Sequence, residues 1–196
     1  MADFLRIHSW VPFSQANGPG CRAVIWVQGC TLKCPGCYNP ETHPQEAGQL
    51  IRPEILFRKI ARLEGKIEGV TISGGEPLQQ IKPLIKILQL FREKTRLSVI
   101  LFTGYTWSEV TEMKESSILF PLVDVIIAGR YQDNQRLAKS LQGSANKTFH
   151  FLTERYKQED FQKVPEAEVL ITPEGKIIST GIDPFFLSGG FNGKKR

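Results

Sequence analysis

The sequence predicts an α/β fold with a mostly parallel sheet, either open or closed into an incomplete (β/α) barrel. Short apolar runs alternate along the chain with amphipathic segments of helical period, which is typical of strands joined by helices. The two most distinctive motifs, 30–37 and 73–77, each follow directly after such a run. Because the functional loops of parallel sheets gather at the carboxyl ends of the strands, we expect both motifs at one edge of the sheet.

In the first half of the chain, the run 23–28 predicts a strand buried on both faces, which leads directly into the cysteine loop. A helix of about three turns is expected from Pro53 to just before Gly65. The run 69–73 predicts a second strand, and the next helix is expected to open at Pro83.

In the second half, the runs 97–102, 123–127 and 148–152 predict three further strands. Thr106 and Glu109 are spaced as a capping box at the start of a short helix. We expect a C-terminal β-hairpin over 169–178, with proline and glycine in its turn, and a frayed end over 188–196.

Length and composition predict one domain over residues 1–196, of which 41% are hydrophobic and 23% charged. No apolar run approaches the roughly 20 residues that a membrane span needs. Asp3 interrupts any basic leader, so the chain is expected to be cytoplasmic. The net charge is +5, but the basic residues are scattered except for Lys194–Arg196, which does not favour nucleic acid as a partner.

Cys30, Cys34 and Cys37 lie on a tight loop that contains Pro35 and Gly36, and they are the candidate metal ligands. In a reducing compartment, clustered cysteines are more often ligands than disulfides. Three thiolates are one ligand too few for a four-iron cluster, which would leave one iron open to a group that is not protein.

A structural zinc site is the alternative interpretation of these cysteines. Zinc sites usually close with a second pair of cysteine or histidine ligands, and the chain has no such pair. His43 and Cys21 are the nearby candidates for a fourth ligand.

The segment 73–77 combines two glycines with an acid before a proline. Gly74 and Gly75 suit a backbone that comes close to a ligand, and Glu76 can accept hydrogen bonds from a ligand ammonium group. Taken alone, the same residues also describe an ordinary turn between a strand and a helix.

The chain resembles the radical S-adenosylmethionine (SAM) superfamily through the spacing of Cys30, Cys34 and Cys37. It resembles more closely the activating enzymes of anaerobic ribonucleotide reductases. That likeness is carried by segments in order along the chain, namely 17–20, 29–39, 73–78, 103–105, 123–131, 143–146 and His150.

The resemblance implies a core over about 17–155 of radical SAM type and a C-terminal extension over about 156–196. It implies that the three cysteines hold a [4Fe-4S] cluster whose fourth iron is chelated by SAM. Electron transfer from the cluster to SAM would then yield a 5'-deoxyadenosyl radical that removes a hydrogen from a glycine of a partner enzyme.

By the same resemblance, Gly74, Gly75 and Glu76 bind the methionine part of SAM, and Gly36 and Tyr38 border its adenine side together with Cys37. Arg130 and Asn146 would line the substrate opening. The implied partners are a glycyl radical enzyme, most simply an anaerobic ribonucleotide reductase, and an electron donor of the flavodoxin or ferredoxin type.

Two positions depart from the family pattern. Ala128 stands where the family usually has an acid, and Cys21 stands where no thiol is required. Asp124 is interpreted as a strand-end acid bonded to backbone, and His150 as a histidine bonded within the fold.

Three functions are consistent with these residues. The first is an activase that installs a glycyl radical on a large partner. The second is a radical SAM enzyme that acts on a peptide or small metabolite. The third is a non-enzymatic metal-binding interaction module.

Overall fold

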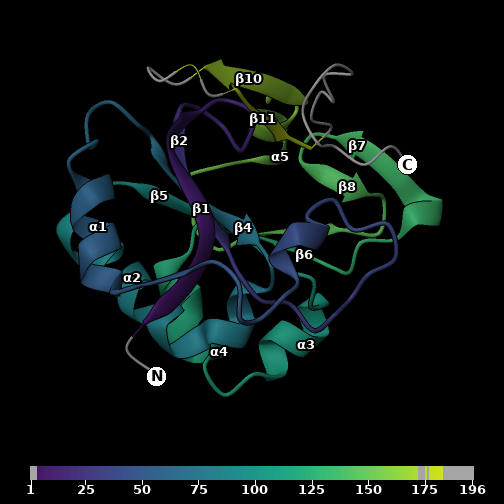
Figure 1. The fold of residues 1–196 in the computed structure, drawn as a ribbon, viewed down its shortest axis with the longest axis horizontal. Helices are drawn as coiled ribbons and strands as arrows, with labels where there is room; N and C mark the ends of the chain where they lie inside the picture. The colour runs from purple at the N-terminus through teal and green to yellow at the C-terminus, as the bar shows by residue number, and fades with distance from the viewer. Residues whose placement is uncertain (1–3, 172–174, 176, 183–196) are drawn as a thin grey trace.

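A computed structural model describes residues 4–171, 175 and 177–182 of the chain. Its main feature is a seven-stranded sheet in the order β3-β1-β2-β4-β5-β6-β9 (Figure 1). The strands of this sheet are β1 (Leu5–Ser14), β2 (Arg22–Val27), β3 (Gln49–Ile51), β4 (Gly69–Gly74), β5 (Ser98–Phe102), β6 (Val125–Ala128) and β9 (Thr148–Phe151). The helices are α1 (Pro53–Ala61), α2 (Ile81–Lys94), α3 (Trp107–Glu112), α4 (Ser116–Leu119) and α5 (Gln158–Phe161).

The four central strands β2, β4, β5 and β6 run parallel, as predicted. Their registers place Val27 opposite Gly74, and Ile72 opposite Leu101. The carboxyl ends of β2 and β4 therefore meet, and the two motifs that follow them lie at the same edge of the sheet. Strands β1, β3 and β9 are antiparallel to their neighbours, so the sheet is mixed at its two sides.

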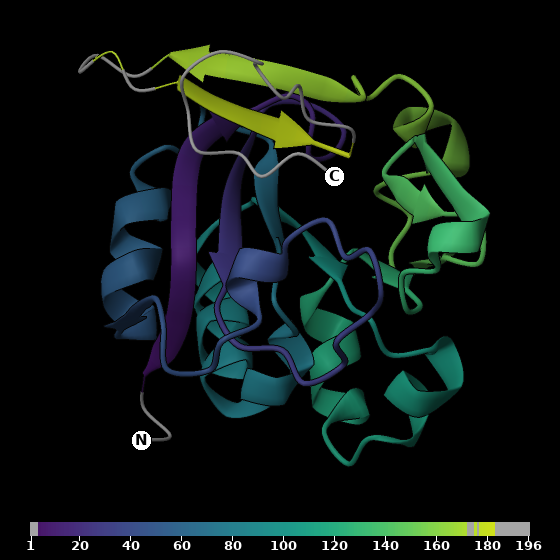
Figure 2. The same ribbon diagram turned by 45° about the vertical axis from the view of Figure 1, so that its right-hand side comes forward.

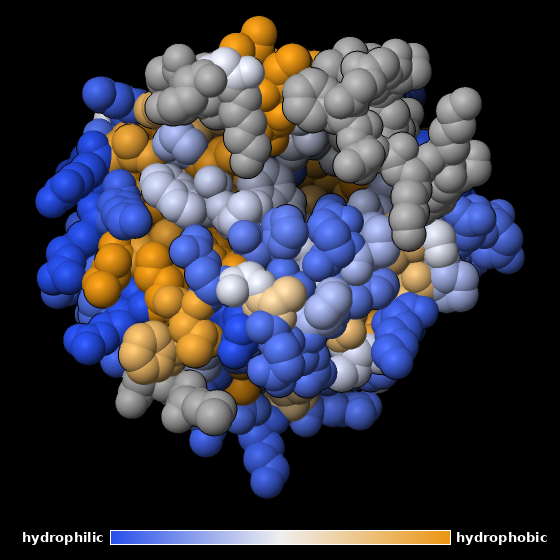
Figure 3. All heavy atoms as spheres, in the orientation of Figure 1, coloured by the Kyte–Doolittle hydropathy of each residue, from blue (hydrophilic) through white to orange (hydrophobic). Residues whose placement is uncertain are grey.

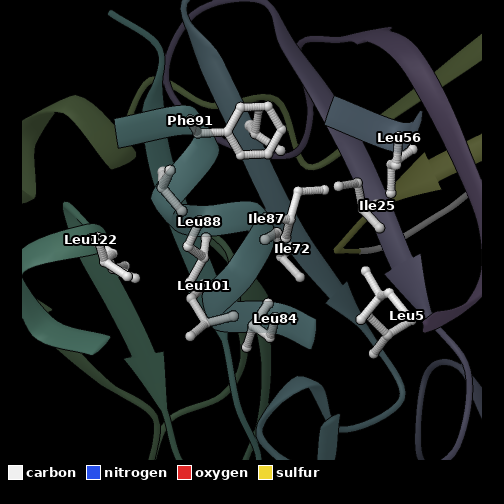
Figure 4. Packing of buried hydrophobic residues seen from close by; sticks show 14 of the residues in the cluster. Leu5, Ile25, Leu56, Ile72, Leu84, Ile87, Leu88, Phe91, Leu101 and Leu122 are labelled. Atoms are coloured by element: carbon white, nitrogen blue, oxygen red, sulfur yellow. The ribbon is translucent and has the colours of Figure 1, made fainter. Parts of the chain in front are cut away.

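Helices α1 and α2 cover one face of the sheet. Leu56 from α1 and Ile87 and Phe91 from α2 are fully buried against side chains of the parallel strands (Figure 4). Each fully buried side chain of this size contributes roughly 1.5–3 kcal/mol to folding. This layer fixes the positions of the strand ends that carry the motifs.

The opposite face of the sheet has a smaller apolar cluster. Strand residues alternate between the faces, so Ile100, Val125 and Ile127 point away from α2 and pack with Phe161 of α5. This second cluster covers only part of the face, because strands β2 and β4 border a cavity there instead.

The structure contains strands that the sequence analysis missed. The longest is β1, whose pairing with β2 shifts register between Val11 and Ser14. Pro12 lies in that irregular stretch, where a residue without a backbone N–H is tolerated. The short antiparallel pair β7 (Arg136–Lys139) and β8 (Gln142–Ser144) was also missed.

Helix α2 begins at Ile81 rather than at Pro83, which lies in its first turn. Helix α1 begins at Pro53 as predicted and ends at Ala61, and Gly65 has φ +86° in the following turn. Thr106 and Glu109 form the predicted capping box of α3.

Strands β10 (Ala167–Ile171) and β11 (Ile177–Gly181) form an antiparallel pair in the region of the expected hairpin. Their connection lies largely outside the described residues, as does the segment 188–196. Figure 2 shows the pair lying across one end of the molecule. The pair has exposed apolar residues, namely Val169, Ile171 and Ile177, and Figure 3 shows apolar side chains gathered over β10.

Within the described part of the chain, no helix combines the length and the apolar character needed to cross a membrane.

Candidate functional site

The cysteine loop follows β2 and borders a cavity of about 530 Å³. Cys30, Cys34 and Cys37 are reduced and partly buried, and all three line this cavity. Hydrogen bonds from Gly29 N to Thr42 O at 2.7 Å and from Cys30 N to His43 O at 3.1 Å fix the ends of the loop. The cavity volume lies within the roughly 300–1,000 Å³ typical of cofactor pockets.

The conformation of the loop suits ligation by sulfur. Lys33 has φ +48° and Gly36 has φ +70°, and such left-handed residues allow a short chain to fold back on itself. Burial raises the pKa of the Cys30 and Cys37 thiols, so the proton of each thiol is retained until a metal displaces it.

The donor set fits an iron–sulfur cluster with one open iron. Among the described residues, no three cysteine, histidine or acidic side chains already converge on one point as a metal site. The three thiols nevertheless interact electrostatically with one another and border the same cavity. Thiolates are the usual ligands of iron–sulfur clusters, so the loop supplies the right chemistry for three of the four irons.

The two candidates for a fourth ligand differ in position. Cys21 lies at the other edge of the sheet, in a separate hollow beside Glu68 and Tyr156. His43 lines the cysteine cavity, and its Nε2 atom is buried with no hydrogen-bond partner among the described residues. Cys21 therefore cannot serve as the fourth ligand of a zinc site at the three cysteines, whereas His43 lies beside them.

The segment after β4 packs against the cysteine loop through its backbone. Gly75 N donates to Val27 O at 2.8 Å, and Glu76 N donates to Gly29 O at 2.9 Å. A Cβ atom on Gly75 would lie 2.4 Å from Gly29 O, so only glycine fits there. Close approach to the neighbouring strand end therefore explains this glycine without a ligand.

Glu76 is 1% exposed, and its carboxylate is held by the protein on several sides. Oε1 accepts hydrogen bonds from Leu78 N at 2.9 Å and from Thr103 Oγ1 at 2.8 Å, and Oε2 accepts from Gly104 N at 2.7 Å. Burial raises the pKa of this carboxyl group, although these hydrogen bonds oppose the shift. Glu76 thus ties the end of β4 to the end of β5, a structural role that its position in the sequence did not reveal.

Gly36 and Tyr38 contact the segment around β7 and β8. A Cβ atom on Gly36 would lie 2.8 Å from Oδ1 of Asp133, and one on Gly143 would lie 2.9 Å from the ring of Tyr38. The rings of Tyr38 and Tyr131 meet edge to face with centroids 4.9 Å apart. Tyr38 therefore lines the cavity while it also packs between two parts of the chain.

Sequence reasoning missed the cavity-lining residues that this segment contributes, among them Tyr131, Gly143 and Lys147. Gly143 belongs to a segment that carried the family resemblance, but its contact with Tyr38 joins residues more than 100 positions apart. Nothing in the local pattern of the sequence signals such a contact.

The two residues expected at the substrate opening contact each other instead of lining the described cavity. Arg130 forms a bidentate ion pair with Glu109, with N–O distances of 2.6 and 2.8 Å. The Asn146 side chain donates to Arg130 O at 2.8 Å.

The interpretations of Asp124 and His150 as residues of the fold agree with their contacts. Asp124 Oδ2 accepts from Val99 N at 2.7 Å. His150 Nε2 lies 2.7 Å from the Thr148 hydroxyl, and its ring stacks on Trp107 with centroids 3.8 Å apart.

The chain is similar to known iron–sulfur and activating proteins. The model of the family "4Fe-4S single cluster domain" matches residues 16–150, which include both motifs. The anaerobic ribonucleoside-triphosphate reductase-activating protein of Vibrio cholerae is 33% identical over 157 residues, covering 76% of this chain and 99% of that protein. The activating protein of the same name from Enterobacteria phage T4 is 35% identical, covering 69% of this chain and 86% of its own.

The pyruvate formate-lyase-activating enzyme of Clostridium pasteurianum is 36% identical over 61% of this chain and 52% of that enzyme. Among solved structures, the crystal structure of QueE from Escherichia coli aligns over 53% of this chain and 54% of its own, with a TM-score of 0.42 and 21% identity. That structural likeness is too remote to support an inference.

The cysteine loop, the strand-end turn beside it and the matching 4Fe-4S family define a radical SAM enzyme of the class that activates glycyl radical enzymes, with a [4Fe-4S] cluster and SAM as cofactors. Within that class, the chain belongs to the family of anaerobic ribonucleoside-triphosphate reductase-activating proteins.

Proposed function

We propose that this chain cleaves SAM reductively and generates a glycyl radical on a partner enzyme, an anaerobic ribonucleotide reductase. The observation that carries the proposal is the set of three reduced cysteines that border one cavity beside the 73–77 turn, with no fourth cysteine near them. The cofactors supply one-electron chemistry when bound, and the protein supplies the ligands and the enclosure.

In this proposal Cys30, Cys34 and Cys37 hold the cluster. Because these cysteines follow β2, the proposed cluster would lie at the carboxyl edge of the parallel strands, beside a cavity with room for a second cofactor. The core over about 17–155 is then a radical SAM domain with an incomplete-barrel sheet, and the whole chain of 1–196 is one unit in which β11 lines part of the cavity.

Gly36, Cys37, Tyr38, Gly74, Gly75 and Glu76 border SAM in this proposal. Glu76 already accepts three hydrogen bonds, and a carboxylate has room for about four, so one position remains for the ammonium group of SAM. Fixed by Thr103 and Gly104, the carboxylate is held in place before the ligand arrives.

The partner and the setting follow from the same assignment. A glycine of a large partner reaches the cavity from outside, and a flavodoxin or ferredoxin supplies the electron. Reduced cysteines and an oxygen-sensitive cofactor favour work in the cytoplasm.

The test uses anaerobically reconstituted full-length protein with SAM and a strong reductant, with and without an anaerobic ribonucleotide reductase. We expect 5'-deoxyadenosine and, with the reductase, the electron paramagnetic resonance (EPR) doublet of a glycyl radical. Cys34→Ser should lose both products. Cys21→Ser is the matched control, because Cys21 lies at the other edge of the sheet, and it should retain both.

Failure of the wild type to form 5'-deoxyadenosine in the presence of the reductase would contradict the proposal. Formation of 5'-deoxyadenosine with an altered peptide or metabolite and no protein radical would favour a different substrate. Purified protein that contains zinc without iron and sulfide would favour a metal-binding module.

A further inference from the structure

Lys147 is the one lysine or arginine among the described residues that line the cysteine cavity. The other ionisable groups around it are mostly ones that carry or acquire negative charge. These are the thiols of Cys30, Cys34 and Cys37 and the carboxyl groups of Glu41 and Glu76. Among the described residues, Lys147 is therefore the single lysine or arginine in a cavity lining whose other ionisable groups are mostly acidic.

The ammonium group of Lys147 is held at the carboxyl edge of the sheet. Its Nζ atom donates to Gly129 O at 2.6 Å. Gly129 follows β6 and Lys147 precedes β9, and these strands pair so that Ala128 lies opposite Thr148. Gly129 N donates to Tyr105 O at 2.8 Å, which holds the acceptor carbonyl in place. The position of the charge is thus set by backbone and not by a flexible side-chain partner.

The charge of Lys147 acts on the cysteine loop and on Glu76. Burial lowers the pKa of the ammonium group, and the negative charges of Glu76, Cys34 and Cys37 raise it. No ion pair to Lys147 exists among the described residues, and the neighbouring Ala128 is buried and uncharged. A charge without a directly paired carboxylate exerts most of its effect on the groups across the cavity.

We propose that Lys147 is a positioning residue whose positive charge stabilises the reduced state of the cluster held by Cys30, Cys34 and Cys37. The inference rests on the proposed function in that it assumes this cluster. Reduction adds one electron from an external donor and so adds one negative charge. Net charge and hydrogen bonding around a cluster set its potential, and a nearby cation makes reduction easier. Lys147 is only partly exposed, so this interaction is stronger than it would be in bulk water.

The test is a redox titration of the anaerobically reconstituted full-length chain without SAM or partner, monitored by EPR. Lys147→Met and Lys147→Gln remove the charge, and Lys147→Arg retains it. Lys139→Met is the matched control, because it removes an exposed lysine from β7, outside the cavity lining. Iron and sulfide are measured in every variant.

We expect the ratio of reduced to oxidised cluster, at the wild-type midpoint potential, to fall about tenfold in Lys147→Met and Lys147→Gln. For a one-electron couple this corresponds to a shift of about 59 mV to more negative potential. Lys147→Arg and Lys139→Met should stay within about twofold of the wild type.

A wild-type midpoint in the neutral variants, with full iron and sulfide, would overturn the inference. So would the loss of cluster from both neutral variants, because Lys147 would then be needed to form the site and not to tune it. Wild-type protein that binds no iron and sulfide would instead overturn the proposed function itself.

Discussion

The two edges of the parallel sheet both bury charged groups, but they use them differently. At the amino edge, Arg22 is fully buried and its guanidinium group donates to Thr71, Ser98, Tyr156 and backbone carbonyls at 2.8–3.2 Å. At the carboxyl edge, ionisable groups surround a cavity of about 530 Å³. The protein itself supplies all the partners of Arg22, whereas the ionisable groups at the carboxyl edge border a cavity with room for a ligand.

The difference lies in how much hydrogen-bonding capacity remains. A guanidinium group has five N–H donors, and Arg22 makes six described contacts through them, so no capacity is left. Glu76 retains one acceptor position, and a lysine such as Lys147 has three donors, of which one is described as bonded. Burial of a charged group does not by itself distinguish a structural network from a functional site. A charged group that keeps unused hydrogen-bonding positions beside a cavity does.

The largest expected loss of stability comes from removing the hydrogen bonds of Arg22 at the amino edge. Arg22→Met should lower the free energy of unfolding by about 4 kcal/mol, because it leaves several buried acceptors without donors. Urea unfolding of the apoprotein measures this loss. Tyr156→Phe, which removes a single hydroxyl from the same network, should cost about 1 kcal/mol.

Arg22→Met should not alter the iron and sulfide content per folded molecule, since Arg22 does not line the cysteine cavity. A loss of stability below about 1 kcal/mol in Arg22→Met would show that the network is dispensable. A selective loss of cluster from stably folded protein would show that the two edges are coupled.

A smaller effect is expected from Glu76→Gln at the carboxyl edge. Leu78 N and Gly104 N donate to different oxygens of Glu76, so either orientation of a glutamine amide places its NH₂ group against a backbone donor. We expect a loss of about 2 kcal/mol in the free energy of unfolding of the apoprotein, again measured in urea.

Glu76→Gln also tests whether Glu76 contributes to SAM binding. The affinity for SAM, measured by equilibrium binding to the reconstituted protein, should fall because the amide cannot pair with an ammonium group as a carboxylate does. Thr103→Val removes one donor to Glu76 and keeps its charge, so it should weaken SAM binding less. Equal affinities in the wild type and Glu76→Gln would limit Glu76 to its role in joining β4 and β5.

The parallel centre of the fold could be predicted because each strand is a local apolar run and each motif directly follows one. The expected runs at 23–28, 69–73, 97–102 and 123–127 became β2, β4, β5 and β6 with small changes at their ends. Strand β1 could not be recognised in the same way, because Pro12 and the polar residues Arg6, His8 and Ser9 interrupt its apolar run. Its place in the sheet depends on pairing with β2, which is a tertiary property.

In the candidate site, too, residues with a local sequence pattern could be predicted and those placed by tertiary contacts could not. The spacing of Cys30, Cys34 and Cys37 predicts them as ligands, and Glu76 is predicted from its place after two glycines together with the family resemblance. All four line one cavity in the structure. Lys147 was missed because a lone lysine before a strand has no local signature. Its place in the cavity lining depends on the pairing of β6 with β9, which brings it beside Gly129.

The smallest expected loss of stability is that of Glu109→Gln. It tests whether burial or the number of hydrogen bonds decides how much a charged group stabilises the fold. Glu109 accepts four described hydrogen bonds, from Arg130 and Thr106, which is more than Glu76 accepts, but its side chain is 40% exposed. The hydrogen bonds from Arg130 are the main cause that lowers the pKa of Glu109 to about 2. Glu109→Gln should lower the free energy of unfolding by less than about 1 kcal/mol at pH 7, because solvent screens exposed pairs.

The pH dependence of this loss follows from the direction of the pKa shift. Because the folded pKa of about 2 lies below the usual value of 4.5, the stabilisation by Glu109 is complete above pH 4.5 and is lost as the pH falls toward 2. The difference in stability between the wild type and Glu109→Gln, measured in urea at pH 7, 4 and 3, should therefore shrink with decreasing pH. A loss at pH 7 as large as that of Glu76→Gln would mean that the number of hydrogen bonds, and not burial, decides what a charged group contributes to this fold.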